Sequence, residues 1–482
     1  MVATYYLNKV RVTNGQKIYL EDLKLLSEIV LSDTRKPFGA KIMEIRLSKL
    51  RFLILFLHCV TVLHINSQWT QFQVIADVCR AYFNVSNSAL DLTVTIWYPV
   101  YMAGCFISAI CLDKIGIRFC ILSASLANLL GSGIKYLSII YTNFVLVCFG
   151  QALASVGQVF TFFLPVCIAS TWFPAEIAST ITAVALFPIY IGGGLGYLLP
   201  TVLVPNDTKP EVQEADLKRF HLIFTVSAGI IFFMNLIFFK NKPKYPPSLA
   251  SVKASVNATG FFSAWKSIIT NRNSNYILIS YTLLQSITNV LLSLLSPMME
   301  RYFPGDNSFI GITGAAVAVL SIPGSATLAW ITDKTRKYKL ITLVICLLLF
   351  PLFGLFIFSL EIKNKIATFL VTLCLGLVVE GTYPIGMDFI VQANYPMSES
   401  ICATLLMFCN QGVSWGSTEA ISYLLHNYNL LYSFAPIALM LVIALISGFF
   451  TKDTLNRDAA NAESSTLSSS APSPNYSSTT LE

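Results

Sequence analysis

Polar side chains crowd a stretch of the chain that is otherwise apolar. The segment INSQWTQFQVIADVC, residues 65–79, continues an apolar run yet carries polar or aromatic residues at steps of three and four: Asn66, Trp69, Gln73 and Asp77. Residues at such steps share one face of a helix. The ring of Trp69 attracts cations through its negative face, and amide groups both donate and accept hydrogen bonds. We therefore expect this face to bind a small organic solute, although a lone Trp can also anchor a helix at a membrane surface.

The composition places this helix inside a membrane. Hydrophobic residues make up 55% of the 482 residues and charged residues only 12%, which is typical of polytopic membrane proteins. A spanning helix needs roughly 20 predominantly apolar residues. Charge-poor stretches predict twelve spanning helices, at 52–76, 90–112, 119–140, 144–169, 177–200, 221–239, 275–297, 309–332, 340–360, 366–387, 401–423 and 429–450.

Basic residues set the expected orientation of these helices. With the first residue on the cytoplasmic side, the inner segments hold 24 of the 32 Lys and Arg residues, in agreement with the positive-inside rule. Both termini are then cytoplasmic. The net charge of +7 follows from this topology and does not indicate a nucleic-acid partner.

Two similar turns divide the chain into halves. LDKIGIRFCIL (112–122) follows the second span and TDKTRKYKLIT (332–342) follows the eighth. Internal repeats of this kind are typical of transporters that move two bundles about a central site. The predicted domains are a cytoplasmic segment, a first six-helix bundle, a cytoplasmic linker, a second six-helix bundle and a disordered cytoplasmic tail, at residues 1–51, 52–239, 240–272, 273–450 and 451–482.

The first turn resembles the signature of the major facilitator superfamily. That signature carries Gly and then Asp-Arg/Lys-x-Gly-Arg-Arg/Lys, and this chain keeps a looser form with Asp113, Lys114, Gly116 and Arg118. The resemblance implies an all-α membrane protein with twelve transmembrane helices in two pseudo-symmetric six-helix bundles. It also implies that Asp113 and Arg118, with Asp333 in the second copy, are gating residues that hold the cytoplasmic ends together while the outer mouth is open.

Five further strings narrow the resemblance. They are QWTQFQVI in the first span, YLLPTVLVPN at 197–206, YFPG at 302–305, DKTRKYK at 333–339 and TYPIGMDFIVQANYPMSES at 382–400. Together they resemble the feline leukaemia virus subgroup C receptor-related family. Members of that family are associated with choline, ethanolamine and haem transport, with calcium-chelate import and with pyridoxine. The resemblance therefore implies a transporter without fixing its cargo.

The sequence also predicts a substrate site. Seven residues form it: Trp69, Gln158, Gln411, Asn66, Tyr98, Tyr101 and Asn289. The resemblance implies that the Trp stacks on a quaternary ammonium and that the two glutamines face the cavity, one from each half. Asn289 lies where the choline-handling members carry a Tyr, so an aromatic wall is replaced there by a hydrogen-bonding amide. The amides can instead hold neighbouring helices together, and the tyrosines can pack in the core.

Two acidic residues lie in the predicted tenth span. Charge inside a bilayer is costly and is usually functional. Glu380 and Asp388, in VVEGTYPIGMDF, are therefore candidates for a proton site or for a counter-charge to a cationic substrate. Either can instead pair with a neighbouring side chain and serve structure alone. Pro384 and the two glycines beside it are expected to break the helix between the two acids.

We interpret the chain as a secondary transporter that moves choline-like or ethanolamine-like cations by alternating access. A haem transporter, or a non-transporting receptor on the same scaffold, are the alternatives. We expect no enzyme, because the sequence contains no nucleophile elbow, P-loop or HExxH string, and no metal or cofactor. The expected partners are a small-molecule substrate and the lipid bilayer, without nucleic acid, and the expected assembly is a monomer.

Short signals suggest where the protein acts. The plasma membrane is the expected location, with an endosomal or lysosomal membrane as the alternative because EDLKLL (21–26) fits an acidic dileucine signal. The sequons at Asn84 and Asn206 fall in predicted outer loops, so we expect glycosylation at both.

Overall fold

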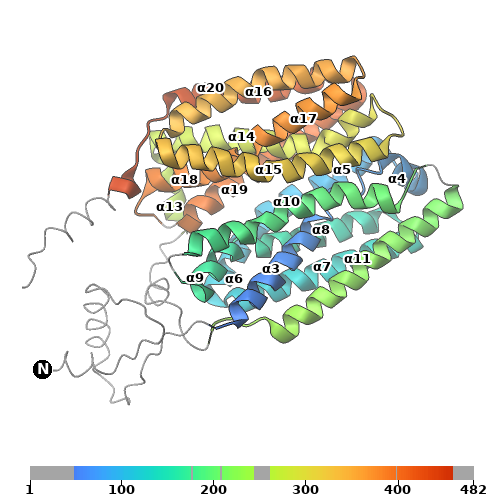
Figure 1. Ribbon diagram of the computed structural model, residues 1–482, viewed down its shortest axis with the longest axis horizontal. Coiled ribbons are helices and arrows are strands. Elements are labelled where there is room, and N and C mark those ends of the chain that lie inside the picture. Colours follow the sequence, from blue (N-terminus) through green and yellow to red (C-terminus); the bar gives the residue numbers. More distant parts are fainter. Residues whose placement is uncertain (1–47, 175–176, 207–208, 244–260, 398, 460–482) are drawn as a thin grey trace, which may run out of the picture.

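The computed structural model describes residues 48–459, apart from 175–176, 207–208, 244–260 and 398 (Figure 1). In these residues the elements are the helices α3 (Leu50–Asn66), α4 (Ala76–Phe83), α5 (Asn87–Thr95), α6 (Trp97–Lys114), α7 (Ile117–Ile140), α8 (Phe144–Thr161), α9 (Leu164–Trp172), α10 (Ala178–Leu203), α11 (Pro210–Phe238), α13 (Phe261–Thr270), α14 (Arg272–Glu300), α15 (Asn307–Thr335), α16 (Tyr338–Glu361), α17 (Lys365–Val379), α18 (Thr382–Asn394), α19 (Glu399–Asn427) and α20 (Leu430–Phe450).

The predicted spans correspond to these helices. Ten stretches of helix in the described residues are long and apolar enough to cross a membrane. The other two predicted spans are the first, which is shortened to α3, and the eleventh, which is the 29-residue α19. The structure therefore agrees with the predicted helical membrane fold.

The helices form two bundles that lie side by side (Figure 1). Helices α3 to α11 make one bundle and helices α14 to α20 make the other, and both run along the long axis of the molecule. Across the interface α10 packs against α15, and α6 packs against α19. The described chain begins and ends at the same end of the molecule, which agrees with termini on one side of a membrane.

Three spans are interrupted, and prolines explain where. Pro99, Pro165 and Pro384 are the second or third residues of α6, α9 and α18. A proline has no N–H to bond the carbonyl four residues earlier. Those carbonyls belong to residues 95, 161 and 380. Helices α5 and α8 end at residues 95 and 161, and α17 ends at residue 379, just before residue 380. The second, fourth and tenth spans are therefore each two helices in series.

The first span is interrupted for a different reason. Side chains at its end bond the backbone of their own helix, because Asn66 Nδ2 donates to Val62 O at 2.8 Å and Ser67 Oγ donates to His64 O at 2.8 Å. Such local bonds compete with helix continuation. Helix α10 also packs closely here, since a Cβ added at Gly192 would lie 2.5 Å from Leu63 O. The chain leaves the helix after Asn66 and resumes helical structure only at Ala76.

The prediction of one continuous helix over 52–76 with a single polar face is therefore wrong. Asn66 and Trp69 do lie together beside a central cavity. Gln73 instead donates to Asp91 Oδ1 at 2.9 Å, and Asp77 accepts from Asn307 Nδ2 at 2.7 Å. The non-helical segment turns these two side chains towards the interface beyond the cavity.

Hydrogen bonds close one end of the interface between the bundles. Asp91 of α5 accepts from Ser422 Oγ, and its Oδ2 lies 2.8 Å from His426 Nε2, both on α19. Arg80 of α4 pairs with Glu300 of α14. This end, which carries α4 and α5 in Figure 1, is called the closed end.

The opposite end of the interface is open. A cavity of about 620 Å³ lies there between the bundles, lined by α6, α9 and α10 on one side and by α15, α18 and α19 on the other. Asp388 and Arg457 lie in its wall, and Arg457 is close to the end of the described chain. The open end is therefore the one at which the described chain begins and ends, and it is cytoplasmic on the predicted topology.

Candidate functional site

A second cavity, of about 190 Å³, lies at the centre of the interface between the bundles. Its walls contain every one of the seven residues predicted to bind substrate: Asn66, Trp69, Tyr98, Tyr101, Gln158, Asn289 and Gln411. Five come from the first bundle and two from the second. This central cavity shares Phe162, Tyr190 and Tyr383 with the wall of the larger one. The two cavities are therefore neighbours, and the central one faces the open end.

The interruptions in the helices supply residues to the central cavity. Trp69 lies in the non-helical segment after α3, Trp97 begins α6, Phe162 separates α8 from α9, and Glu380 separates α17 from α18. Irregular backbone at membrane depth is tolerated where it lines a cavity or is buried in protein. The interruptions in the helices therefore lie at the central cavity, where a solute would bind.

Glu380 gives the central cavity its charge. Among the described residues that line the cavity, Glu380 is the only Asp, Glu, Lys or Arg. Its side chain is half-buried and makes no ion pair or side-chain hydrogen bond with any other part of the described chain. A carboxylate at membrane depth is costly unless something positive pairs with it. The site therefore favours a cation.

Hydrogen bonds fix how two of the cavity amides are oriented. Because Asn66 Nδ2 donates to Val62 O, Asn66 presents its Oδ1 to Gln158, whose Nε2 donates to it at 2.9 Å. Asn289 Nδ2 donates to Ser414 Oγ at 3.0 Å. Gln158 Oε1 and Asn289 Oδ1 then remain as acceptors without a donor in the described chain. Gln158 and Asn289 therefore offer amide oxygen atoms as hydrogen-bond acceptors.

Aromatic side chains surround these polar groups. Tyr98 and Tyr101 of α6 are both 3% exposed. The Tyr98 hydroxyl bonds Ser293 Oγ across the interface, whereas the Tyr101 hydroxyl has no partner in the described chain. The indole N–H groups of Trp69 and Trp97 are also buried and without a partner there. These three donors are therefore buried beside the cavity without a partner in the described chain.

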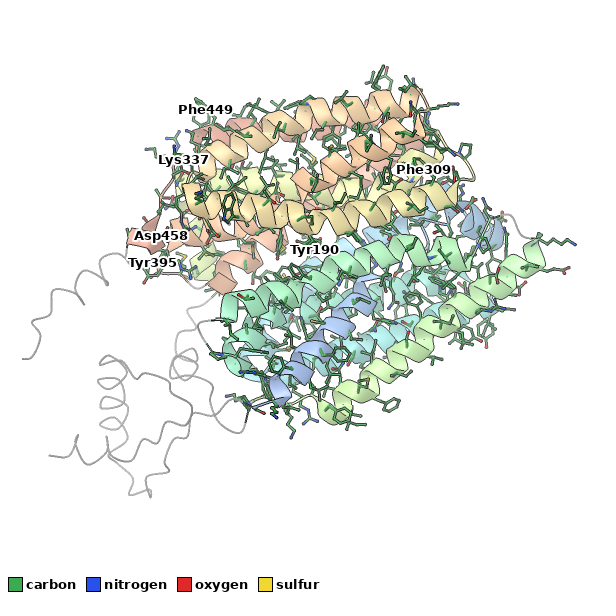
Figure 2. The ribbon with its side chains drawn as sticks, in the orientation of Figure 1. Tyr190, Phe309, Lys337, Tyr395, Phe449 and Asp458 are labelled. Atoms are coloured by element: carbon green, nitrogen blue, oxygen red, sulfur yellow. The ribbon has the colours of Figure 1, made fainter. Side chains whose placement is uncertain are left out.

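Tyr281, an aromatic residue of the second bundle, does not line the central cavity. Tyr281 of α14 is fully buried and bonds Thr342 Oγ1 at 2.6 Å, outside the cavity. Tyr190 of α10 does line the cavity and lies between the bundles in Figure 2. Tyr190 therefore adds an aromatic ring to the central cavity from the first bundle.

Sequence reasoning missed a buried lysine that supports the site. Lys135 of α7 is 1% exposed and donates to Gln68 Oε1 and, at 3.3 Å, to Gln151 Oε1. Gln151 Nε2 in turn donates to the backbone oxygens of Gln68 at 3.1 Å and Trp69 at 3.5 Å. These bonds hold the non-helical segment that carries Trp69. The signal in the sequence was the charge of Lys135 inside a predicted span, because such a charge requires polar partners.

Of the three predicted gating residues, Arg118 and Asp333 line neither cavity. The side chain of Asp113 lies outside the described residues. Arg118 donates to Leu236 O at 3.1 Å within its own bundle. Asp333 is 3.8 Å from Arg336, which is also 3.5 Å from Asp458 near the end of the described chain. The interface is open at this end, so the contacts of Arg118 and Asp333 do not join the two bundles. The gating role of these residues remains a prediction.

The remaining predicted residues lie at the two ends of the interface. Asp388 lines the larger cavity and accepts from the Tyr338 hydroxyl. Asn84 is exposed in left-handed conformation (φ 53°) directly after α4. Asn206 is half-buried and donates to Asp77 Oδ2. Asn84 is therefore the more accessible of the two predicted glycosylation positions.

Comparison with known proteins agrees with this architecture. A family model described as Major Facilitator Superfamily matches residues 57–418. The choline/ethanolamine transporter flvcr2a of Danio rerio is 30% identical over 435 residues, which cover 89% of this chain and 92% of that protein. This chain belongs to the Major Facilitator Superfamily, in its feline leukaemia virus subgroup C receptor-related branch.

Other members of the superfamily are similar as well. The choline/ethanolamine transporter FLVCR1 of Felis catus is 31% identical over 372 residues, covering 76% of this chain and 66% of that one. The solved structure of a bacterial homolog to the human lysosomal transporter Spinster, in an inward-facing and unoccupied conformation, has a TM-score of 0.65 at 14% identity and covers 86% of this chain and 99% of its own. A D-xylose-proton symporter has a TM-score of 0.64 at 16% identity, with 84% and 98% covered. The solved structures show the fold, and the predicted facilitator fold of a multi-pass membrane protein is confirmed.

Proposed function

We propose that this chain carries a small organic monocation of the choline and ethanolamine class across its membrane by alternating access. The main support for the proposal is the lining of the central cavity. Glu380 is the single charged residue among the described lining residues, and aromatic rings form much of the wall. A cation is attracted both by the carboxylate and by the faces of aromatic rings. A neutral or anionic solute would leave Glu380 without a counter-charge.

The size and the donors of the cavity fit an amino alcohol. Its 190 Å³ equals the volume of about six water molecules at roughly 30 Å³ each, which suits a solute of few non-hydrogen atoms. The amides of Asn410 and Gln411 line the cavity, and an amide N–H group can donate to an alcohol oxygen. The relatives named choline/ethanolamine transporters support the same class of cargo.

The closed and open ends support the alternating-access part of the proposal. On the predicted topology the closed end faces outwards and the open end faces the cytoplasm, so the described conformation is inward-facing. A solute in the central cavity then reaches only the cytoplasm. Outward release requires the bonds around Asp91 to break and the open end to close. We propose the plasma membrane as the site of this cycle, with both termini cytoplasmic.

Uptake of labelled ethanolamine and choline by cells that lack their own carriers tests the proposal. Trp69→Ala removes an aromatic face and is expected to lower uptake about tenfold at matched surface expression. Trp330→Ala is the matched control, because 61% of Trp330 is exposed on α15 and it lines neither cavity. Absence of uptake by the wild type, or wild-type uptake by Trp69→Ala, would contradict the proposal.

A further inference from the structure

We propose that the central cavity selects ammonium groups that carry N–H bonds, so that this chain prefers ethanolamine to choline. This inference rests on the proposed function. Both compounds carry one positive charge at neutral pH and one hydroxyl group. They differ at the nitrogen, which has three N–H bonds in ethanolamine and three methyl groups in choline. The groups that face the nitrogen therefore decide between them.

The carboxylate of Glu380 is the first such group. It is exposed to the central cavity and has no ion-pair or side-chain hydrogen-bond partner in the described chain. A carboxylate attracts any cation through charge, but it forms charge-assisted hydrogen bonds only with a cation that has N–H or O–H donors. A trimethylammonium group gains the attraction and leaves the acceptor oxygens unpaired. Leaving buried acceptors unpaired costs free energy that a primary ammonium does not lose.

Two amide oxygens are the second such group. Gln158 and Asn289 use their N–H groups on Asn66 and Ser414, at 2.9 and 3.0 Å. The first orientation is fixed by the bond from Asn66 Nδ2 to Val62 O, because Asn66 must then offer oxygen to Gln158. The two residues that carry these free oxygens, one from each bundle, line the same cavity as Glu380. Acceptors on opposite bundles suit a nitrogen with several donors.

The distribution of aromatic rings around the cavity also favours ethanolamine over choline. A quaternary ammonium is recognised best when aromatic faces surround it. On the second bundle the described lining residues include one aromatic ring, that of Tyr383, and Tyr281 lies outside the cavity. Asn289 and Glu380 occupy that side instead. Glu380 and Asn289 therefore place acceptor oxygens on the second-bundle side, where a quaternary ammonium would need rings.

A series of N-methylated ethanolamines tests the proposal. Ethanolamine, N-methylethanolamine, N,N-dimethylethanolamine and choline keep the charge and the hydroxyl while the N–H bonds fall from three to none. In uptake by the full chain, we expect the half-saturation concentration to rise along the series, to about tenfold higher for choline. Glu380→Gln keeps the shape but removes the charge, and is expected to reduce this ratio to about threefold or less. Glu380→Asp retains the carboxylate and is expected to keep the order.

Glu419→Gln is the matched control. Glu419 of α19 is a half-buried acid of the same bundle that does not line the cavity, so its variant is expected to keep the wild-type order. Choline equal to or better than ethanolamine in the wild type would overturn the selectivity while leaving the proposed function intact. A preference that survives Glu380→Gln would overturn the role of Glu380. Absence of uptake of all four compounds by surface-expressed wild type would overturn the proposed function itself.

Discussion

The two ends of the interface between the bundles differ in chemistry as well as in shape. The closed end is held by polar pairs that cross the interface: Asp91 with Ser422 and His426, Arg80 with Glu300, and Asp77 with Asn307. The open end is lined mostly by apolar residues, which include alanines on both bundles, on α6, α10, α15 and α19. Each of these pairs includes a charged group, and exchanging such a hydrogen bond for water costs about 1.5–3 kcal/mol, or about 1 kcal/mol or less where solvent screens the pair. Small apolar residues let helices approach closely.

The two ends of the interface are therefore expected to have different roles in the transport cycle. The closed end can open because water replaces its hydrogen bonds, and the open end can close because its alanines leave room for packing. Between them lies Glu380, half-buried in the central cavity. A transport cycle needs both changes, so variants at either end should impair transport by different routes.

The largest effect is expected from filling the open end. Ala329→Trp puts a bulky ring into the wall of the larger cavity and prevents the two bundles from meeting. Overpacking costs about 1–3 kcal/mol, so we expect ethanolamine uptake to fall about tenfold or more. Val319→Trp on the same helix is the control, because Val319 is 53% exposed and lines neither cavity. Equal uptake by the two variants would show that the open end does not need to close.

A smaller effect is expected from weakening the closed end. Asp91→Ala leaves Gln73, Ser422 and His426 without their shared acceptor, at a cost of about 1–3 kcal/mol. We expect the closed end to open in a larger fraction of molecules and uptake to fall several-fold.

Asn84 directly follows α4 and Lys363 lies between α16 and α17, and both are exposed at the closed end. Spin labels at these two positions measure this shift in a background without reactive cysteines. The distribution of distances between the labels should gain a longer component in Asp91→Ala. An unchanged distribution would show that Asp91 does not hold this end shut.

The smallest effect is expected at the rim of the closed end. The side chains of Arg80 and Glu300 are 27% and 15% exposed, so solvent screens their pairing. Arg80→Gln and Glu300→Gln are each expected to change uptake about twofold, which corresponds to about 1 kcal/mol or less. The double variant should be no worse than either single variant, because the pair is lost only once. Additive losses would mean that the two side chains act separately.

The sequence predicted the spans and much of the cavity, because both depend on local patterns. Apolar runs define the helices, and the family resemblance implied a common site for Trp69, Gln158 and Gln411, which the structure brings to one cavity. Three of the four interruptions follow from prolines, and Pro99 shows that this signal could have been used more fully. The interruption after Asn66 depends on close packing against Gly192 of α10, which the local pattern does not contain.

The closed end could not be predicted from the sequence. Asp91 and His426 are separated by 335 residues, and their pairing exists only in a conformation that closes this end. Lys135 could be recognised as a charge in need of partners, but Gln68 and Gln151 become its partners only once the first span is interrupted. Contacts that depend on conformation or on irregular backbone cannot be predicted from the local spacing of residues in the sequence.

The most direct test of the central claim is an experimental structure of the full chain with ethanolamine bound. We expect density for the ligand in the central cavity, with the ammonium nitrogen about 3 Å from a carboxylate oxygen of Glu380 and within about 6 Å of the Trp69 ring centre. Ligand bound elsewhere, or bound in the cavity with its nitrogen turned away from Glu380, would contradict it.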